Sequence, residues 1–134
     1  MKNELSAMAV VICDGKVLVT VEDIYGRNVL SLPKGHVEAG ETVLDAAIRE
    51  CFEETDVTLE RHNAERELPS YSYVFSTPEG EQIRKTITPV LFRLDVEPSP
   101  LAKEKRMLEA KFMPIDDFLR DCSYDNVRKL FENI

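Results

Sequence analysis

Three glutamates and an arginine stand together at positions 49 to 54 of this chain of 134 residues. Glu50, Glu53 and Glu54 are spaced i, i+3 and i+4, which places their side chains on one face of a helix. Like charges at this spacing destabilise a helix by ~0.2–0.5 kcal/mol per pair. Clustered carboxylates therefore indicate a compensating cation, and oxygen ligands favour a hard one, Mg²⁺ or Mn²⁺. The alternative is a solvated acidic helix face.

One helix, from Thr42 to Thr55, is expected to carry these carboxylates. Thr42 suits the N-cap position, with Asp45 three residues later as in a capping box. At about 100° per residue, one side of this helix is apolar and adjoins the glutamate face. The helix is therefore expected to pack on a core while its neighbouring face lines a site. The apolar side contains Leu44, Ala47, Ile48, Cys51 and Thr55.

The other elements indicate an α/β fold with a mixed sheet. Asp14-Gly15 separates two apolar, β-branched runs, which is a strong hairpin signal. Early hairpins followed by a helix, more strands and closing helices predict a mixed sheet with helices on its faces. Pro89 lies inside the longest strand and suggests an edge or a bulge. Strands are expected at 7–13, 16–21, 29–32, 71–75, 82–96 and 109–113, and closing helices at 114–121 and 124–131.

Length and composition predict one soluble domain covering residues 1–134. Hydrophobic residues make up 43% and charged residues 31% of the chain, as in ordinary globular proteins. No apolar run is long enough for a membrane span, and the N-terminus lacks a signal-peptide core, so we expect a cytoplasmic protein. Cys13, Cys51 and Cys122 form no Cys-x-x-Cys motif, and buried, reduced thiols are expected.

The formal net charge of −8 restricts the kind of partner. Nonspecific binding of a nucleic-acid polymer requires a basic surface, which this composition argues against. A phosphorylated small molecule is compatible with an acidic site when metal ions lie between the two sets of negative charge.

The segment from Gly35 to Val57 resembles the Nudix signature, a glycine and charged residues at fixed spacing. Its defining positions are occupied in register by Gly35, Glu41, Arg49, Glu50, Glu53, Glu54 and Val57. There are two departures. Cys51 stands where the family prefers a larger aliphatic residue. Asp56 stands where the family has a helix-ending glycine. Because Asp tolerates positive φ, the turn is expected to survive at a cost of about 1 kcal/mol.

The resemblance extends to Leu32-Pro33-Lys34 and to residues 111–118. It implies a Nudix-type α/β/α sandwich with a central mixed β-sheet. It also implies Mg²⁺-dependent (or Mn²⁺-dependent) hydrolysis of a pyrophosphate bond, in a nucleoside diphosphate linked to another group. A catalytically weak Nudix-fold module that binds or senses nucleotides is the alternative. The intact glutamates favour the enzyme, while Asp56 keeps the alternative open.

The resemblance also implies roles for single residues. Glu53 and Glu54 would be the main metal ligands, and Glu50 a ligand or the base that activates water. Arg49 would orient a glutamate through a bidentate contact. Glu41 would support the metal ligands from a second layer.

Further ligands are implied outside the helix. The backbone carbonyl of Lys34 is expected to join the metal ligands. A glutamate from a late loop is expected as well. Glu104 and Glu109 are the candidates, and Glu109 is the one we assign.

Substrate contacts are expected from Lys34, Gly35, Lys85 and Tyr73. Lys34-Gly35-His36 resembles the lead-in of diadenosine polyphosphate and diphosphoinositol hydrolases, and the Arg84–Ile87 segment resembles a strand of the former group. Tyr71 or Tyr73 is a candidate to stack on a base, worth ~1–3 kcal/mol. Dinucleoside polyphosphates, nucleoside triphosphates and ADP-ribose remain open, with a preference for the first. A homodimer is frequent in the family.

Overall fold

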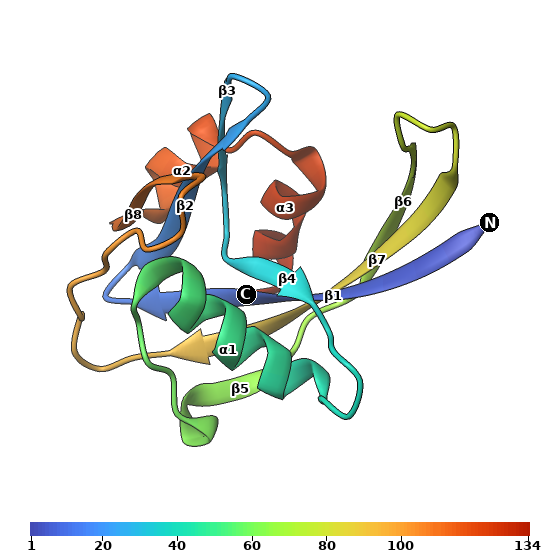
Figure 1. The fold of residues 1–134 in the computed structure, drawn as a ribbon. Coiled ribbons are helices and arrows are strands. Elements are labelled where there is room, and N and C mark those ends of the chain that lie inside the picture. The colour runs from blue at the N-terminus through green and yellow to red at the C-terminus, as the bar shows by residue number, and fades with distance from the viewer.

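A computed structural model describes residues 1–134 and shows one mixed sheet with helices on both faces (Figure 1). The strands are β1 (Lys2–Cys13), β2 (Lys16–Ile24), β3 (Arg27–Ser31), β4 (Lys34–His36), β5 (Ala64–Glu67), β6 (Tyr71–Ser76), β7 (Gln82–Arg93) and β8 (Met107–Pro114). The α-helices are α1 (Val43–Thr55), α2 (Ile115–Asp121) and α3 (Asp125–Lys129). Two short 3₁₀ turns cover Arg61–Asn63 and Leu130–Asn133.

The sheet is built around β1. Its central path runs β3-β2-β1-β7-β5, while β4 pairs with β1, β6 with β7 and β8 with β2. Strands β1 and β7 are parallel, and the other pairs are antiparallel. The predicted mixed sheet is confirmed, and so is the hairpin at Asp14-Gly15.

Alternating residues of β1 face two separate cores. Met8 and Val10 belong to the core that contains Phe118 of α2. Ala7 and Ala9 belong to the core that contains α1. Because side chains alternate along a strand, β1 is buried on both faces, which explains its continuous apolar sequence. Helices therefore cover both sides of the sheet, which confirms the α/β/α sandwich.

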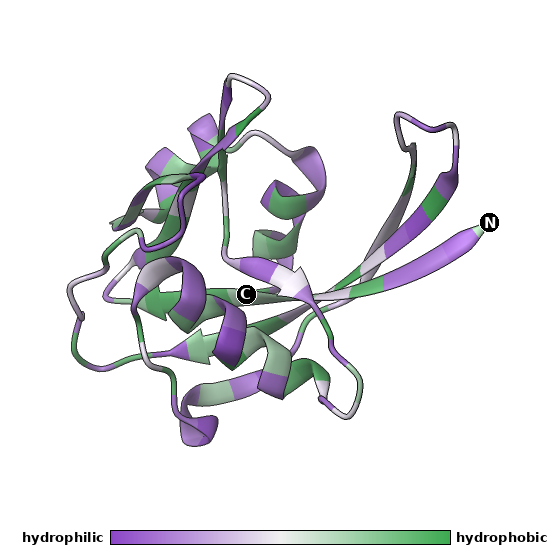
Figure 2. Ribbon diagram, viewed as in Figure 1, coloured by the Kyte–Doolittle hydropathy of each residue, from purple (hydrophilic) through white to green (hydrophobic).

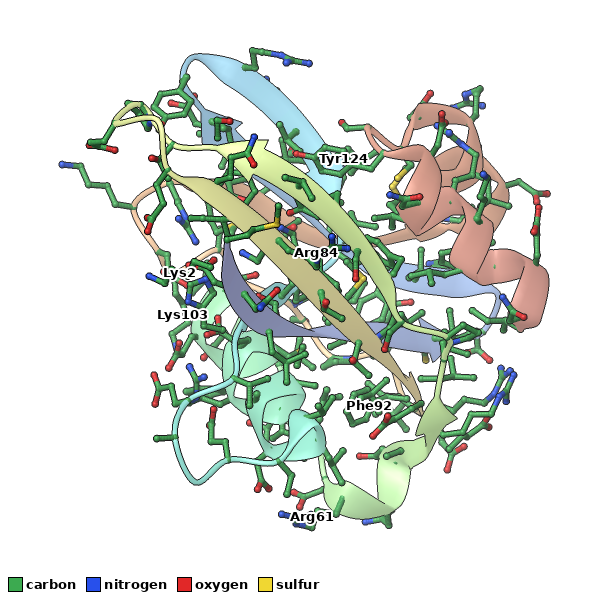
Figure 3. The ribbon with its side chains drawn as sticks, turned by 90° about the vertical axis from the view of Figure 1, so that its right-hand side faces the viewer. Lys2, Arg61, Arg84, Phe92, Lys103 and Tyr124 are labelled. Atoms are coloured by element: carbon green, nitrogen blue, oxygen red, sulfur yellow. The ribbon has the colours of Figure 1, made fainter.

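The two layers can be followed in the figures. The hydrophobic colours gather at the centre of the sheet, while the projecting N-terminal end of β1 is hydrophilic (Figure 2). Phe92 lies on the α1 side of the sheet, and Tyr124 lies beside α3 on the other side (Figure 3). The small side chains of Ala7 and Ala9 face α1, and both are fully buried.

Several features differ from the sequence-based expectation, including the end of β7 at Arg93 rather than at residue 96. Strand β1 begins at Lys2, because its first residues pair with β7 beyond the apolar run. Strand β4 was not expected, since three residues around a glycine carry no alternating pattern. Pro89 does not mark an edge, because β7 lies between β1 and β5. Its carbonyl accepts the Leu68 N–H at 2.9 Å, where β5 gives way to β6, so its missing N–H falls at a change of partner strand.

The ends of three strands project from the body of the molecule: the start of β1, all of β6 and the start of β7 (Figure 1). None of the helices is both long enough and apolar enough to cross a membrane. The three cysteines are free and buried, as expected.

Candidate active site

Helix α1 is capped at both ends, as its sequence predicts. The Thr42 hydroxyl accepts the Asp45 N–H at 3.0 Å, and the Asp45 carboxylate accepts the Thr42 N–H at 3.3 Å. At the other end Asp56 adopts φ 61° and ψ 18°, and its N–H donates to the Phe52 carbonyl at 2.9 Å. The left-handed turn is thus kept without a glycine.

Arg49 is the centre of a hydrogen-bonded cluster. Its Nε and Nη2 donate to the two carboxylate oxygens of Glu41 at 2.7 and 3.0 Å, a bidentate pair. Its Nη1 donates to Glu50 at 2.8 Å and to Glu53 at 3.3 Å. Its Nη2 also donates to the backbone carbonyl of His36 at 2.9 Å. One guanidinium therefore links the loop before α1, the helix and β4.

The charges of this cluster shift the pKa values of its members. The Arg49 guanidinium, together with the Glu38 N–H, lowers the pKa of Glu41 to about 2. Hydrogen bonds from Arg49, to Glu41 above all, raise the pKa of the guanidinium itself. Glu41 is therefore ionised throughout the physiological range, as a residue that holds Arg49 in place must be.

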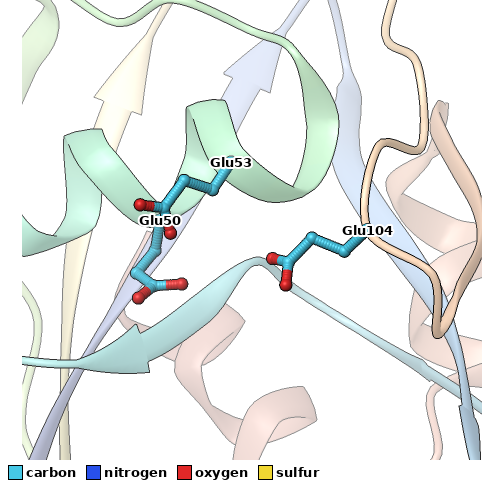
Figure 4. Close-up of side chains that lie close together, drawn as sticks. All are labelled: Glu50, Glu53 and Glu104. Carbon is cyan, nitrogen blue, oxygen red and sulfur yellow. The ribbon is translucent and has the colours of Figure 1, made fainter.

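Three carboxylates meet beside this cluster, from two distant parts of the chain (Figure 4). Glu50 and Glu53 extend from α1, and Glu104 extends toward them from the loop before β8. One oxygen of each lies within 4.8 Å of the others. Oxygens that share a hard cation at about 2.0–2.1 Å lie at most about 4.2 Å apart, so small side-chain movements would bring these three onto one ion. The donor set and its spacing therefore fit Mg²⁺ or Mn²⁺.

Glu109 does not join this group, so Glu104 replaces it in the assignment. Glu109 lies opposite Val21, and Lys111 lies opposite Val19 in the β2–β8 pair. Directly paired residues share a face of the sheet, and Val19 belongs to the core on the α2 side. Glu109 consequently faces away from α1, where its carboxylate pairs with the Lys111 Nζ at 3.2 Å.

Glu54 lies deeper than the other glutamates. Its side chain is buried, and one carboxylate oxygen accepts the Lys34 N–H at 3.2 Å. Burial, followed by the charge of Glu50, raises the pKa of Glu54 to about 8. Burial also raises the pKa of Glu50. The positive charge near these two carboxyls does not offset the cost of burying their ionised forms, which is a further sign that the site suits a cation.

The three carboxylates border a cleft of about 660 Å³. Lys34 and Lys85 also line it, with Gly35, His36 and Phe75 nearby. Burial and the charge of Lys34 lower the pKa of Lys85. Two lysines directed at one space repel each other, and an anion between them would relieve that repulsion.

A smaller chamber of about 200 Å³ adjoins the cleft at Lys34. Three tyrosines contribute to its walls, and it is lined by Lys34, Tyr71, Tyr73, Ile87, Tyr124 and Asn126. The side chains of Tyr71, Tyr73 and Ile87 share a face because they are paired or alternate on β6 and β7. Both tyrosines considered from the sequence thus line one space.

Several lining residues were missed by the sequence analysis. Glu22 and Arg106 form an ion pair at 2.8 Å on the cleft wall. Tyr124 and Asn126 come from the start of α3, which carries no motif. A tyrosine in front of a short polar helix is the only sequence feature that could have indicated these two residues. His36 lines the cleft, whereas His62 lies in an exposed 3₁₀ turn.

Comparison with known proteins gives a consistent result. The family model described as NUDIX domain matches residues 3–134. MutT4 of Mycobacterium tuberculosis is 36% identical over 111 residues, which are 82% of this chain and 42% of MutT4. The chain spans less than half the length of the curated relatives that it matches.

Two solved structures share the fold. A MutT NUDIX hydrolase from Burkholderia pseudomallei has a TM-score of 0.77 at 22% identity, covering 100% of this chain and 99% of that one. An Ap4A hydrolase of C. elegans, solved as a binary complex, has a TM-score of 0.73 at 18% identity, covering 96% and 93%. At these identities the likeness concerns the fold alone.

Proposed function

The chain belongs to the Nudix family, and on this premise we propose that it is a Mg²⁺-dependent pyrophosphohydrolase. Its substrate would be a nucleoside diphosphate linked to another group, with dinucleoside polyphosphates preferred over nucleoside triphosphates and ADP-ribose. We propose that residues 1–134 act as a single domain. A cytoplasmic location is supported by the three free thiols, and homodimer formation stays a prediction.

The observation that carries the proposal is the convergence of Glu50, Glu53 and Glu104 at a cleft that Lys34 and Lys85 also line. A bound divalent ion supplies two things: it neutralises phosphate charge and lowers the pKa of water. The three carboxylates would hold that ion. Glu54 and the Lys34 carbonyl are proposed as further ligands, because the Lys34 N–H already contacts Glu54.

The protein residues divide the remaining work. Arg49 holds Glu50 and Glu53 at fixed positions, and Glu41 holds Arg49. Glu50 is proposed either as a ligand of the ion or as the base that accepts a proton from the attacking water. Attack of water breaks one P–O–P bond and leaves two phosphate-ended products. Lys34 and Lys85 are placed to contact the phosphate oxygens.

The aromatic chamber is the proposed site of the nucleoside. At about 200 Å³ it is smaller than the roughly 300 Å³ or more of a complete ligand pocket. It would therefore receive one end of a substrate whose phosphates lie in the adjoining cleft. Tyr73 offers a ring for stacking, worth ~1–3 kcal/mol.

A nucleotide panel tests this function. Diadenosine tetraphosphate, nucleoside triphosphates and ADP-ribose are incubated with the protein in Mg²⁺ or in EDTA, and products are identified by mass. We expect cleavage only with Mg²⁺. Tight binding without metal-dependent cleavage would instead establish a sensing module.

The nucleoside site is tested by Tyr73→Leu with Val74→Ala as the matched control. These neighbours on β6 point to opposite faces, and only Tyr73 lines the chamber. Loss of stacking predicts a KM about tenfold higher for Tyr73→Leu, from 1.4 kcal/mol per tenfold. Equal KM values for the two variants would remove the nucleoside from this chamber.

A further inference from the structure

The loop that carries Glu104 spans residues 94–106 and is anchored on both sides of Glu104. On one side Arg106 pairs with Glu22 at 2.8 Å, and its carbonyl accepts the Asp23 N–H at 2.9 Å. On the other side the Leu101 N–H donates to the Thr55 carbonyl at 2.8 Å, at the C-terminal end of α1. Glu104 lies between the two anchors.

Lys103 strengthens the second anchor through two contacts. Its Nζ lies 3.2 Å from the Asp56 carboxylate and 3.6 Å from the centroid of the Phe52 ring. Both partners belong to the C-terminal end of α1. Lys103 therefore extends to the end of the helix, while the next residue extends into the cleft toward Glu50 and Glu53 (Figures 3 and 4).

The Glu104 carboxylate needs such a restraint. It approaches two other carboxylates, and in the absence of a cation all three repel one another. The backbone of Glu104 is held by a single bond, from the Met107 N–H to its carbonyl at 2.9 Å. Without Lys103 fixed beside it, the loop could relieve the repulsion by moving outward.

The helix end does not require the side chain of Asp56. A glycine adopts its left-handed conformation at less cost and would end the helix equally well. What aspartate adds is the carboxylate that holds Lys103. We propose that Asp56 is a positioning residue: through Lys103 it holds Glu104 against Glu50 and Glu53. The inference rests on the proposed function, since it assigns the metal to these glutamates.

The experiment measures Mn²⁺ binding by electron paramagnetic resonance without substrate. Asp56→Gly and Asp56→Asn are expected to bind Mn²⁺ about three- to fivefold more weakly, the effect of one partly exposed ion pair. Glu104→Gln is expected to weaken binding at least as much. In the Glu104→Gln background, Asp56→Gly should have no further effect, because the residue it positions no longer binds.

Charge alone is separated from positioning by Lys103→Met. Loss of a positive charge near an acidic cluster would by itself strengthen Mn²⁺ binding, whereas loss of the anchor weakens it. Lys105→Met removes the same charge from the same loop and is expected not to weaken binding. In the metal-free protein, hydrogen exchange at the Met107 amide should be faster in Asp56→Gly and Lys103→Met than in the wild type.

The outcomes are distinguishable. Absence of Mn²⁺ binding by the wild-type protein would overturn the proposed function and this inference together. Wild-type binding that Glu104→Gln weakens but Asp56→Gly and Lys103→Met do not would overturn the positioning role alone. Additive losses in the double variant Asp56→Gly/Glu104→Gln would overturn it as well.

Discussion

Gly35 is expected to be required for catalysis and not for folding. It lies in β4 against α1, and its φ is not in the left-handed region, so alanine there causes no backbone strain. The obstacle to alanine is steric, because the Glu50 carboxyl group occupies the position that the added Cβ would take. A Cβ on Gly35 would overlap the carboxyl carbon and both carboxyl oxygens of Glu50, far inside van der Waals contact.

The cost of Gly35→Ala follows from how Glu50 can respond. Normal contact distances of about 3.5 Å require its carboxyl group to move by roughly 1 Å or more. An off-rotamer side chain costs ~0.5–1.5 kcal/mol, and the 2.8 Å hydrogen bond from Arg49 is weakened. Because Arg49 keeps Glu41, the net loss of stability is expected to be about 1–2 kcal/mol. Displacement of a catalytic group by 1 Å costs about 10²-fold in rate.

The assay compares kcat in Mg²⁺ with the thermal midpoint, and Gly80→Ala is the control. Gly80 has φ +86° with no atoms near an added Cβ, so alanine there costs ~1–2 kcal/mol of strain and leaves kcat unchanged. The two variants should therefore have similar stability and very different activity. A Gly35→Ala protein with kcat within about twofold of wild type would refute this account of Glu50, given the expected factor of 10².

Two further predictions concern the buried Glu54 and the choice between Glu104 and Glu109 as a metal ligand. The pKa of Glu54 is raised to about 8, so in EDTA the unfolded state releases this proton at lower pH than the folded state. The contribution of Glu54 to the free energy of unfolding is then largest below pH ~4.5 and falls as pH rises toward ~8, by up to a few kcal/mol. Urea unfolding at pH 5 and pH 8 should show this fall in wild type and not in Glu54→Gln. An equal change in the free energy of unfolding between the two pH values in both proteins would contradict a buried charge at Glu54. Glu104→Gln should lower kcat in Mg²⁺ by at least about tenfold, whereas Glu109→Gln should not, and the reverse result would restore the original assignment.

The elements that position the site were largely predictable from local sequence. Thr42 with Asp45 indicated the start of α1, and the left-handed Asp56 was expected at its end. The bidentate pair between Arg49 and Glu41 was implied by the resemblance and is present in the structure. These features depend on residues close in sequence, whose geometry a helix and one loop determine.

The features that the sequence did not predict correctly depend on contacts between residues far apart in the chain. Whether Glu109 faces α1 depends on the register between β8 and β2, which no local pattern specifies. Slippage by one residue would have placed Glu109 on the opposite face. Tyr124 reaches the chamber only because α3 packs behind the sheet. Such contacts follow from topology rather than from spacing along the chain.

The distribution of charge across the cleft explains how an acidic protein could accept an acidic substrate. Arg49 faces Glu41, Glu50 and Glu53 with a single positive charge, so the carboxylates keep an excess of negative charge that a divalent ion offsets. Lys34 and Lys85 repel each other across the same space, and phosphate groups would offset that repulsion. Each ligand therefore reduces the electrostatic cost that the other meets. Because coupling of this kind is reciprocal, metal affinity should rise with bound nucleotide by the same factor as nucleotide affinity rises with bound metal.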